Sequence, residues 1–364
     1  MSETRKRARD LGLTIGLLEP GPFNAITDVA GVRVGHSTVR HGEAPGDYGK
    51  GPAITGVTAI IPGDNLGDGA VPAGKHVLNG TGEVTGISEI EGIGRIDTPI
   101  MLTNTMGVGI VYDATCRWVI ENDPDVVAKG GTAIPIVGEC NDGSLNDAHG
   151  MHVRGEHAIE AIENATSGPV AEGCVGSGSG MVCFEFKGGI GTSSRKLSAE
   201  FGGYTVGALV MSNFGRRPWL TIEGYPVGQR YPHPAYGDQP FTLPEKGSCI
   251  VVIATDAPLT SKQLDRIAQR GGLGLGRIGS FAGNGSGDFI VAFSTGYRMP
   301  THRSPTYTVE LVTDFWLDPL FAATREATEE AVVNSLCMAE TTTGLHGNMV
   351  EAMPYDWIED VLKR

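Results

Sequence analysis

The dipeptide Gly247-Ser248 stands where a polar, proline-rich segment gives way to an apolar run. A serine hydroxyl can attack the carbonyl carbon that precedes it, and a glycine there permits the strained backbone that an N→O acyl shift needs. Cutting at this point would free the α-amine of Ser248; the reference pKa of an α-amine, about 7.7–8.0, makes such a group a usable base beside the hydroxyl. One residue would then be both nucleophile and base, whereas the alternative reading of Gly-Ser is an ordinary turn.

Further polar residues stand at the ends of apolar segments that are predicted as strands. Two such segments end at Glu139 and at Asn213, one begins at Ser248, and one follows Ser286 and Asp288. If the two pairs of strands run antiparallel, all these groups lie at one edge of a sheet. Two carboxylates, an amide and two hydroxyls would converge there. Polar residues also end many strands that have no function.

The pattern of apolar residues predicts the elements that would position these groups. Alternating or continuous apolar runs predict strands at 26–39, 56–63, 131–139, 205–213, 247–260 and 288–295. Apolar residues at helical spacing predict helices at 152–168, 261–272 and 318–344. Strands and helices do not alternate regularly, so a doubly wound parallel sheet is not favoured.

Capping residues and prolines mark several boundaries. Ser261 is expected to begin one helix, which would stop at the next glycine pair, and Asp318 begins the longest helix, which would end at Gly344. The segment 217–246 contains six prolines and is expected to be an exposed loop.

Composition limits the class of protein. The 364 residues are 40% hydrophobic and include 54 glycines, and the net charge of −14 argues against a nucleic-acid or anionic-membrane partner. No apolar run is long enough for a membrane span or a signal peptide, and the six cysteines form no C-x-x-C pair. We therefore expect reduced thiols and a cytoplasmic location.

Two glycine motifs suggest phosphate binding, but their context does not. Gly274, Gly276 and Gly279 have the G-x-G-x-x-G spacing, yet a predicted helix precedes them where a strand is required. The run at 176–180 lacks the lysine of a P-loop. Neither motif is interpreted as a cofactor site, and no cofactor is expected.

Histidines and a cysteine near the polar strand ends offer other chemistry. His149, His152 and His157 do not have the spacing of a zinc site, so we expect structural histidines and no metal. Cys249 follows Ser248 directly and must point to the opposite face of the strand, which predicts a buried, inert thiol.

The sequence resembles the family of L-aminopeptidase/D-alanine esterase-amidases and β-aminopeptidases, which are self-processing serine hydrolases. The resemblance extends almost from end to end and is carried by the blocks at 9–36, 101–109, 138–150, 212–215, 247–259, 283–295 and 327–344. It implies a four-layer αββα sandwich of α/β class, with the N-terminal-nucleophile architecture that is shared with ornithine acetyltransferase.

The resemblance also assigns roles to the polar residues at the strand ends. It implies that Ser248 is the new N-terminal nucleophile and that Asn213 supplies the oxyanion-hole amide. Glu139 matches the carboxylate that holds the free amine of the substrate. Ser286 and Asp288 match a hydroxyl–carboxylate pair that orients the nucleophile and its amine.

The sequence departs from some members of this family at two positions. Asn141 stands where they carry an aromatic residue, which bears on the side chains that the substrate pocket accepts. Asp288 stands where they carry a glutamate, so the carboxylate is shorter by one methylene.

The resulting hypothesis is a single self-processing domain, 1–364, that is cleaved into 1–247 and 248–364. Its substrate would be a short peptide or an amino-acid amide or ester, and the resemblance implies a homotetramer of processed heterodimers. Two alternatives stay open: acetyl transfer of the ornithine acetyltransferase type, which typically uses threonine at the cut, and an unprocessed protein that binds small molecules.

Overall fold

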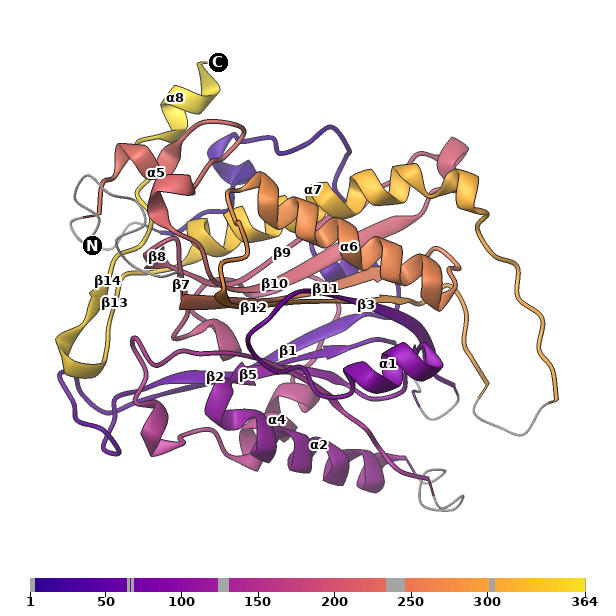
Figure 1. The fold of residues 1–364 in the computed structure, drawn as a ribbon, viewed down its shortest axis with the longest axis horizontal. Helices are drawn as coiled ribbons and strands as arrows, with labels where there is room; N and C mark the ends of the chain where they lie inside the picture. Colours follow the sequence, from indigo (N-terminus) through magenta and orange to yellow (C-terminus); the bar gives the residue numbers. More distant parts are fainter. Residues whose placement is uncertain are drawn as a thin grey trace.

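The computed structural model describes residues 4–63, 66, 69–123, 131–233, 246–300 and 305–363. Within these ranges two sheets are stacked face to face, and helices cover both outer faces (Figure 1). The larger sheet has the strand order β4-β3-β12-β11-β10-β9 and the smaller has the order β1-β2-β5-β6. The expected four-layer αββα sandwich is confirmed.

The larger sheet is made of strands from all parts of the chain. Its members are β3 (Val71–Gly80), β4 (Arg95–Ile96), β9 (Gly189–Lys196), β10 (Thr205–Asn213), β11 (Lys246–Thr255) and β12 (Gly285–Ser294). The smaller sheet contains β1 (Arg33–His41), β2 (Ala53–Ile61), β5 (Ile100–Asn104) and β6 (Ile136–Cys140). Two short hairpins are formed by β7 (Val182–Cys183) with β8 (Phe186–Lys187) and by β13 (Thr342–Thr343) with β14 (Met349–Val350).

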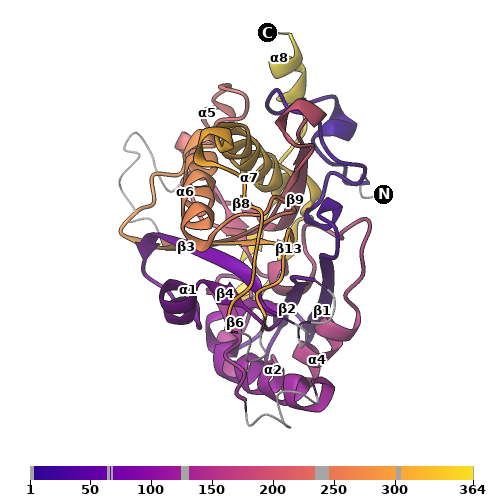
Figure 2. The ribbon, with the colours of Figure 1, turned by 90° about the vertical axis from the view of Figure 1, so that its right-hand side faces the viewer.

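The helices form the two outer layers, which are separated clearly in the view turned by 90° (Figure 2). The larger sheet is covered by α6 (Ser261–Arg277) and α7 (Asp318–Met338), and the smaller by α2 (Val108–Asn122) and α4 (Gly155–Glu163). The shorter helices are α1 (Ile87–Ile93), α5 (Val227–Arg230) and α8 (Ile358–Leu362). No helix in the described part of the chain is long and apolar enough to cross a membrane.

Strand β11 illustrates why apolar residues follow one another without polar residues between them in several strands. Val251 and Ile253 pack into the core under α6 and α7, whereas Ile250 and Val252 pack into the core between the two sheets. Both faces of the strand are therefore buried, and alternation of polar and apolar residues disappears.

The predicted elements exist, with shifted boundaries. The strand expected at 205–213 is β10 with the same limits. The strand expected from residue 26 begins at Arg33, because Ile26–Asp28 forms a 3₁₀ turn. In the segment 217–246, expected to be a loop, Arg217–Trp219 forms another 3₁₀ turn and Val227–Arg230 forms α5, and residues 234–245 lie outside the described ranges.

Helix α6 begins and ends differently from the expectation. Thr260 is the N-cap, and its hydroxyl accepts a hydrogen bond of 3.2 Å from the backbone N–H of Gln263. The helix continues past the glycine pair expected to end it, because α6 lies directly against α7. A Cβ at Gly274 would stand 2.7 Å from the carbonyl oxygen of Arg325, so the glycine permits this close approach.

Helix α7 ends at Met338 instead of at Gly344. Ala339 is extended, and Thr342 and Thr343 form β13. These β-branched threonines favour a strand, and local helical spacing could not reveal the partner strand that they pair with.

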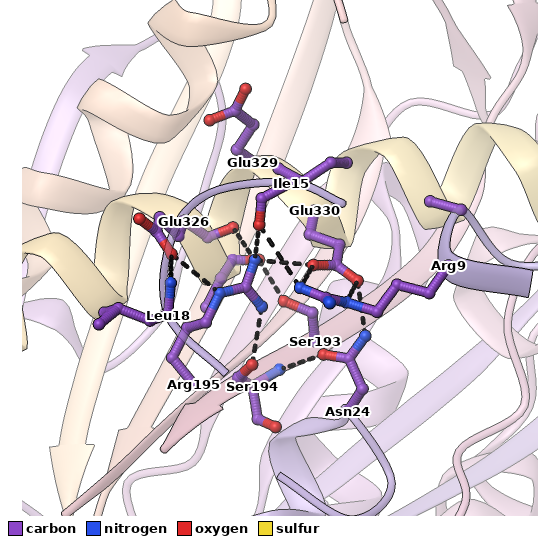
Figure 3. A network of polar contacts seen from close by, with 12 residues as sticks. Arg9, Ile15, Leu18, Asn24, Ser193, Ser194, Arg195, Glu326, Glu329 and Glu330 are labelled. Atoms are coloured by element: carbon purple, nitrogen blue, oxygen red, sulfur yellow. Dashed lines mark hydrogen bonds and ion pairs between the residues drawn. The ribbon is translucent and has the colours of Figure 1, made fainter. Parts of the chain in front are cut away.

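A buried charged network ties α7 to β9 and to the N-terminal segment (Figure 3). Arg195, which has no exposed surface, contacts Glu326 at 3.1 Å and Glu330 at 2.7 Å. Glu330 also pairs with Arg9 at 2.9 Å and accepts a hydrogen bond of 2.6 Å from Asn24. Arg9 and Arg195 precede residue 247, whereas Glu326 and Glu330 follow it.

Candidate active site

Ser248 is the third residue of β11 and lies at the edge of the larger sheet. It pairs with Asn213 on antiparallel β10 and with Gly287 on parallel β12, and it is 4% exposed. Since side chains alternate along a strand, Ser248 shares the face of Ile250, which is directed toward the smaller sheet. Its hydroxyl is therefore presented to the space between the two sheets.

Cys249 occupies the opposite face, as expected. Its side chain belongs to the core under α6 and α7, and burial raises the pKa of its thiol well above the ordinary value. A thiol that stays protonated at neutral pH is a poor nucleophile.

Gly247 lies in the extended strand, has no positive φ and packs closely against β10. Whether it permits a strained backbone during the acyl shift stays a prediction. A Cβ at this position would lie 2.7 Å from the carbonyl oxygen of Asn213 and 2.9 Å from Cα of Phe214. A residue with a side chain would push β11 away from β10 at the point where Ser248 and Asn213 meet.

Asn213 is the last residue of β10, and both ends of its carboxamide are held. Its Oδ1 accepts a hydrogen bond of 2.9 Å from the backbone N–H of Val182, and its Nδ2 donates one of 3.0 Å to the carbonyl oxygen of Asn141. A carboxamide nitrogen has two N–H donors. The second donor is therefore available for an oxygen placed beside Ser248.

Asn141 contributes to this arrangement through its backbone. Its side chain is exposed, and Oδ1 accepts a hydrogen bond of 2.9 Å from the backbone N–H of Gly143. The carbonyl group of Asn141 thus orients Asn213, and its side chain lies at the cavity wall.

Glu139 reaches the site from the other sheet. It lies on β6, beside Thr103 of parallel β5, and is 5% exposed. Its carboxylate accepts hydrogen bonds from the backbone N–H of Glu83 at 3.1 Å and from the hydroxyl of Thr105, while burial raises its pKa. The expectation that all polar strand ends share one sheet edge is therefore wrong for Glu139, because the convergence comes from stacking two sheets.

Ser286 and Asp288 form the expected hydroxyl–carboxylate pair on β12. Ser286 donates a hydrogen bond of 2.8 Å to Oδ1 of Asp288, and both residues are fully buried. They stand on either side of Gly287, the residue that pairs with Ser248. The shorter carboxylate of aspartate is thus long enough to bind its serine.

A cavity of about 900 Å³ joins most of these groups, but Ser286 and Asp288 are not among its lining residues. Five residues that the sequence assigned to the catalytic or substrate-binding site line it: Glu139, Asn141, Asn213, Gly247 and Ser248. Further lining residues, which the sequence did not assign to this site, include Tyr48, Thr105, Asp142, His149, Glu185 and Arg216. Thr105 could have been found, because it directly follows β5, and neighbouring parallel strands end at the same sheet edge.

The three histidines have structural contacts. His152 lies 3.1 Å from Asp147, and His157 accepts a hydrogen bond from the backbone N–H of Arg154 at the start of α4. The ring of His149 packs edge-on against Tyr48 at the cavity. Within the described ranges, no three His, Cys, Asp or Glu side chains are close enough together to hold a metal ion.

The glycine motifs also belong to the framework. Gly274 and Gly276 lie inside α6, and Gly279 follows its end with φ +108°. Gly176–Gly178 forms a buried 3₁₀ turn. Neither motif is a loop between a strand and the start of a helix, which a dinucleotide or nucleotide phosphate requires.

The fold and this site define a class of protein: an enzyme with the N-terminal-nucleophile hydrolase fold. Comparison with known proteins identifies the family, since the model of "Peptidase family S58" matches residues 24–350. The chain therefore belongs to peptidase family S58.

Individual relatives agree with this family over nearly the whole chain. The beta-peptidyl aminopeptidase BapA of Sphingosinicella microcystinivorans is 45% identical over 98% of this chain and 92% of its own. Two solved structures each cover 98% of both chains. The PH0078 protein of Pyrococcus horikoshii has a TM-score of 0.90 at 44% identity. The L-aminopeptidase D-Ala-esterase/amidase of Ochrobactrum anthropi, described as a prototype of the serine aminopeptidases and a variant of the Ntn hydrolase fold, has a TM-score of 0.89 at 42% identity. Aminopeptidase activity is the function that these findings support.

Proposed function

We propose that this chain cuts itself between Gly247 and Ser248 and then acts as an aminopeptidase with Ser248 as nucleophile. One observation carries the proposal: Ser248, its strand partner Asn213 and the carboxylate of Glu139 line one cavity although they come from two different sheets. A hydroxyl, an amide donor and a buried carboxylate are the groups needed to attack, stabilise and select a substrate with a free amine.

Self-cleavage uses the hydroxyl of Ser248 against the carbonyl carbon of Gly247. Oγ forms a bond to that carbon, the C–N bond breaks, and the nitrogen of Ser248 takes up the hydroxyl proton and becomes an α-amine. Water then hydrolyses the resulting ester and releases a carboxylate at Gly247. Asn213 is the donor that would stabilise the negative oxygen in both steps.

Substrate hydrolysis repeats this chemistry with an external carbonyl. The free α-amine of Ser248 takes the hydroxyl proton as Oγ attacks, and the leaving amine receives it, which gives an acyl-enzyme that water hydrolyses. Ser286 and Asp288 orient the nucleophile and its amine. Glu139 pairs with the ammonium of the first substrate residue, so an internal peptide, which has no free amine, is expected to be a poor substrate.

The substrate class follows from this pairing and from the relatives. Short peptides and amino-acid amides or esters with a free amine would fit this site. The names of the relatives refer to β-peptides and to D-alanine esters and amides as their substrates. The side chain of Asn141 lies at the wall of the cavity where it can influence which acyl groups enter. The steps need no cofactor.

The two pieces are expected to stay together after cleavage. Arg195 and Arg9 belong to residues 1–247, and their partners Glu326 and Glu330 belong to residues 248–364 (Figure 3). Separating the pieces would break these ion pairs and expose the apolar core in which residues of both pieces, such as Val210 and Val251, pack together, which is strongly unfavourable. We propose that these heterodimers assemble into a homotetramer.

We also propose that the protein is located in the cytoplasm, because its six free cysteines suit a reducing compartment.

The mass of the purified protein tests self-cleavage most directly. Dividing 38.2 kDa in proportion to chain length gives pieces of about 26 and 12 kDa. Amino-terminal sequencing of the smaller piece is expected to read Ser-Cys-Ile-Val. A single intact chain after days at neutral pH would contradict self-processing and favour a binding protein.

The charge of Glu139 can be tested separately from the nucleophile. Glu139→Gln keeps the shape of the side chain but removes its charge, so kcat/KM for a free-amine substrate is expected to fall about tenfold to 150-fold. Self-cleavage involves no substrate amine and should continue. Glu163→Gln, which removes an exposed carboxylate on α4, is the matched control.

The assay compares an amino-acid p-nitroanilide with its N-acetylated form. The wild type should strongly prefer the free amine, and the variant should lose this preference. Equal hydrolysis of both compounds by the wild type would refute amine recognition. If Glu139→Gln has unchanged activity while the wild type prefers the free amine, another carboxylate binds the substrate ammonium, and Asp288 is the first candidate.

A further inference from the structure

The hairpin of β7 and β8 lies beside Asn213 and has an unusual turn. Val182 pairs with Lys187, and Cys183 pairs with Phe186, so Phe184 and Glu185 form a two-residue loop. Both loop residues have positive φ, +51° and +53°. Two-residue turns of this kind favour asparagine and glycine, and bulky side chains in the left-handed region are strained.

Contacts on several sides hold the strained turn in place. The backbone N–H of Phe184 donates a 2.8 Å hydrogen bond to the carbonyl oxygen of Phe214, and the two rings stack edge-to-face 5.3 Å apart. Glu185 accepts hydrogen bonds from the backbone N–H of Arg217 at 2.6 Å and from the side chain of Arg216 at 3.1 Å. Strain that is maintained by so many contacts is typical of functional sites.

Lys187 lies at the base of this hairpin and has no exposed surface. Its ammonium group donates hydrogen bonds to three backbone carbonyl oxygens, of Gly178 at 3.2 Å, Met181 at 2.9 Å and Gly188 at 2.8 Å. Burying an ammonium group is costly, and burial lowers the pKa of this lysine. Its contacts therefore call for an explanation beyond simple packing.

One of these contacts leads directly to Asn213. The carbonyl group of Met181 and the N–H of Val182 belong to the same planar peptide group. Lys187 binds the oxygen of that group at 2.9 Å, and the N–H of the same group donates to Oδ1 of Asn213 at 2.9 Å. A cation on the oxygen polarises the peptide group and strengthens the hydrogen bond that its N–H donates.

We propose that Lys187 is a positioning residue for catalysis, which acts through the Met181–Val182 peptide group to fix the carboxamide of Asn213. With Oδ1 held toward Val182, Nδ2 is directed to Asn141 and to the cavity, so the free N–H donor points to the reacting oxygen. The hairpin between β7 and β8 supplies the rigid support. This inference rests on the proposed role of Asn213.

A double-mutant cycle tests whether Lys187 acts through Asn213. Lys187→Met removes the ammonium group but keeps the aliphatic stem. We expect kcat, and the rate of self-cleavage, to fall about tenfold to a hundredfold, part of the loss seen when an oxyanion-hole donor is removed. KM should change less than about threefold, because substrate binding does not use this donor. In an Asn213→Ala background the same change should have almost no further effect.

The control and the stability measurement separate positioning from general damage. Lys262→Met, at a lysine whose side chain is 84% exposed, should leave cleavage and kcat unchanged. Urea unfolding of the variants in a Ser248→Ala background gives their stabilities without interference from cleavage. If Lys187→Met does not fold, Lys187→Gln, which keeps N–H donors for these carbonyls, takes its place and should show a smaller loss with the same dependence on Asn213.

The outcomes distinguish the positioning role of Lys187 from the oxyanion role of Asn213. If the fold-losses in kcat from Lys187→Met and Asn213→Ala multiply in the double variant, Lys187 does not act through Asn213. This result would overturn the positioning role and leave the proposed function intact. An equal rise in KM and fall in kcat would also overturn it. Full activity of Asn213→Ala would instead refute the oxyanion role and remove the basis of the inference.

Discussion

Replacing Ser248 with alanine is expected to leave one uncleaved chain without hydrolase activity. The change removes the only group that the proposed mechanism uses to attack a carbonyl, both in self-cleavage and in substrate turnover. Because it deletes one hydroxyl at a strand edge, the free energy of unfolding should change by no more than about 1 kcal/mol. Denaturing electrophoresis, intact mass and hydrolysis of an amino-acid p-nitroanilide measure these effects.

Cys249→Ala is the matched control for this variant. It also removes one heavy atom from β11, but on the face that packs against the core under α6 and α7. It should cleave and turn over substrate like the wild type. Cleavage of Ser248→Ala at the normal rate would show that another residue is the nucleophile.

The second large effect is expected from Asn213→Ala. Loss of an oxyanion-hole donor typically lowers kcat about a hundredfold to a thousandfold. The same loss should slow self-cleavage, since the attack on Gly247 also forms a negative oxygen. The time course of cleavage on a denaturing gel gives the first effect, and kcat of the cleaved fraction gives the second.

A remote asparagine provides the comparison. Asn122 ends α2 at the surface and donates a hydrogen bond to the carbonyl oxygen of Trp118, so Asn122→Ala should leave both rates unchanged. If Asn213→Ala raised KM and left kcat unchanged, Asn213 would be a substrate-binding residue and the oxyanion would be stabilised elsewhere.

Local sequence pattern determined much of the larger sheet. The limits of β10 follow from its apolar run, and Ser248 and Cys249 could be assigned to opposite faces of β11 because side chains alternate along any strand. Ser286 and Asp288, two residues apart, could be expected to act together, and the structure joins them by a hydrogen bond.

Longer-range packing decided what local pattern could not. Glu139 lines the same cavity as Ser248 because two sheets stack, and the period of one strand does not reveal the sheet to which it belongs. Gly247 is needed because β10 approaches β11 closely at this residue, and this contact cannot be inferred from the dipeptide Gly-Ser alone. Lys187, an unremarkable lysine in sequence, became significant only when folding buried its ammonium group against the peptide group that holds Asn213. The sequence thus determined which groups could react and the face of each strand that carries them. Only the tertiary structure decided which groups meet, because contacts between residues distant in the chain depend on the packing of all the layers together.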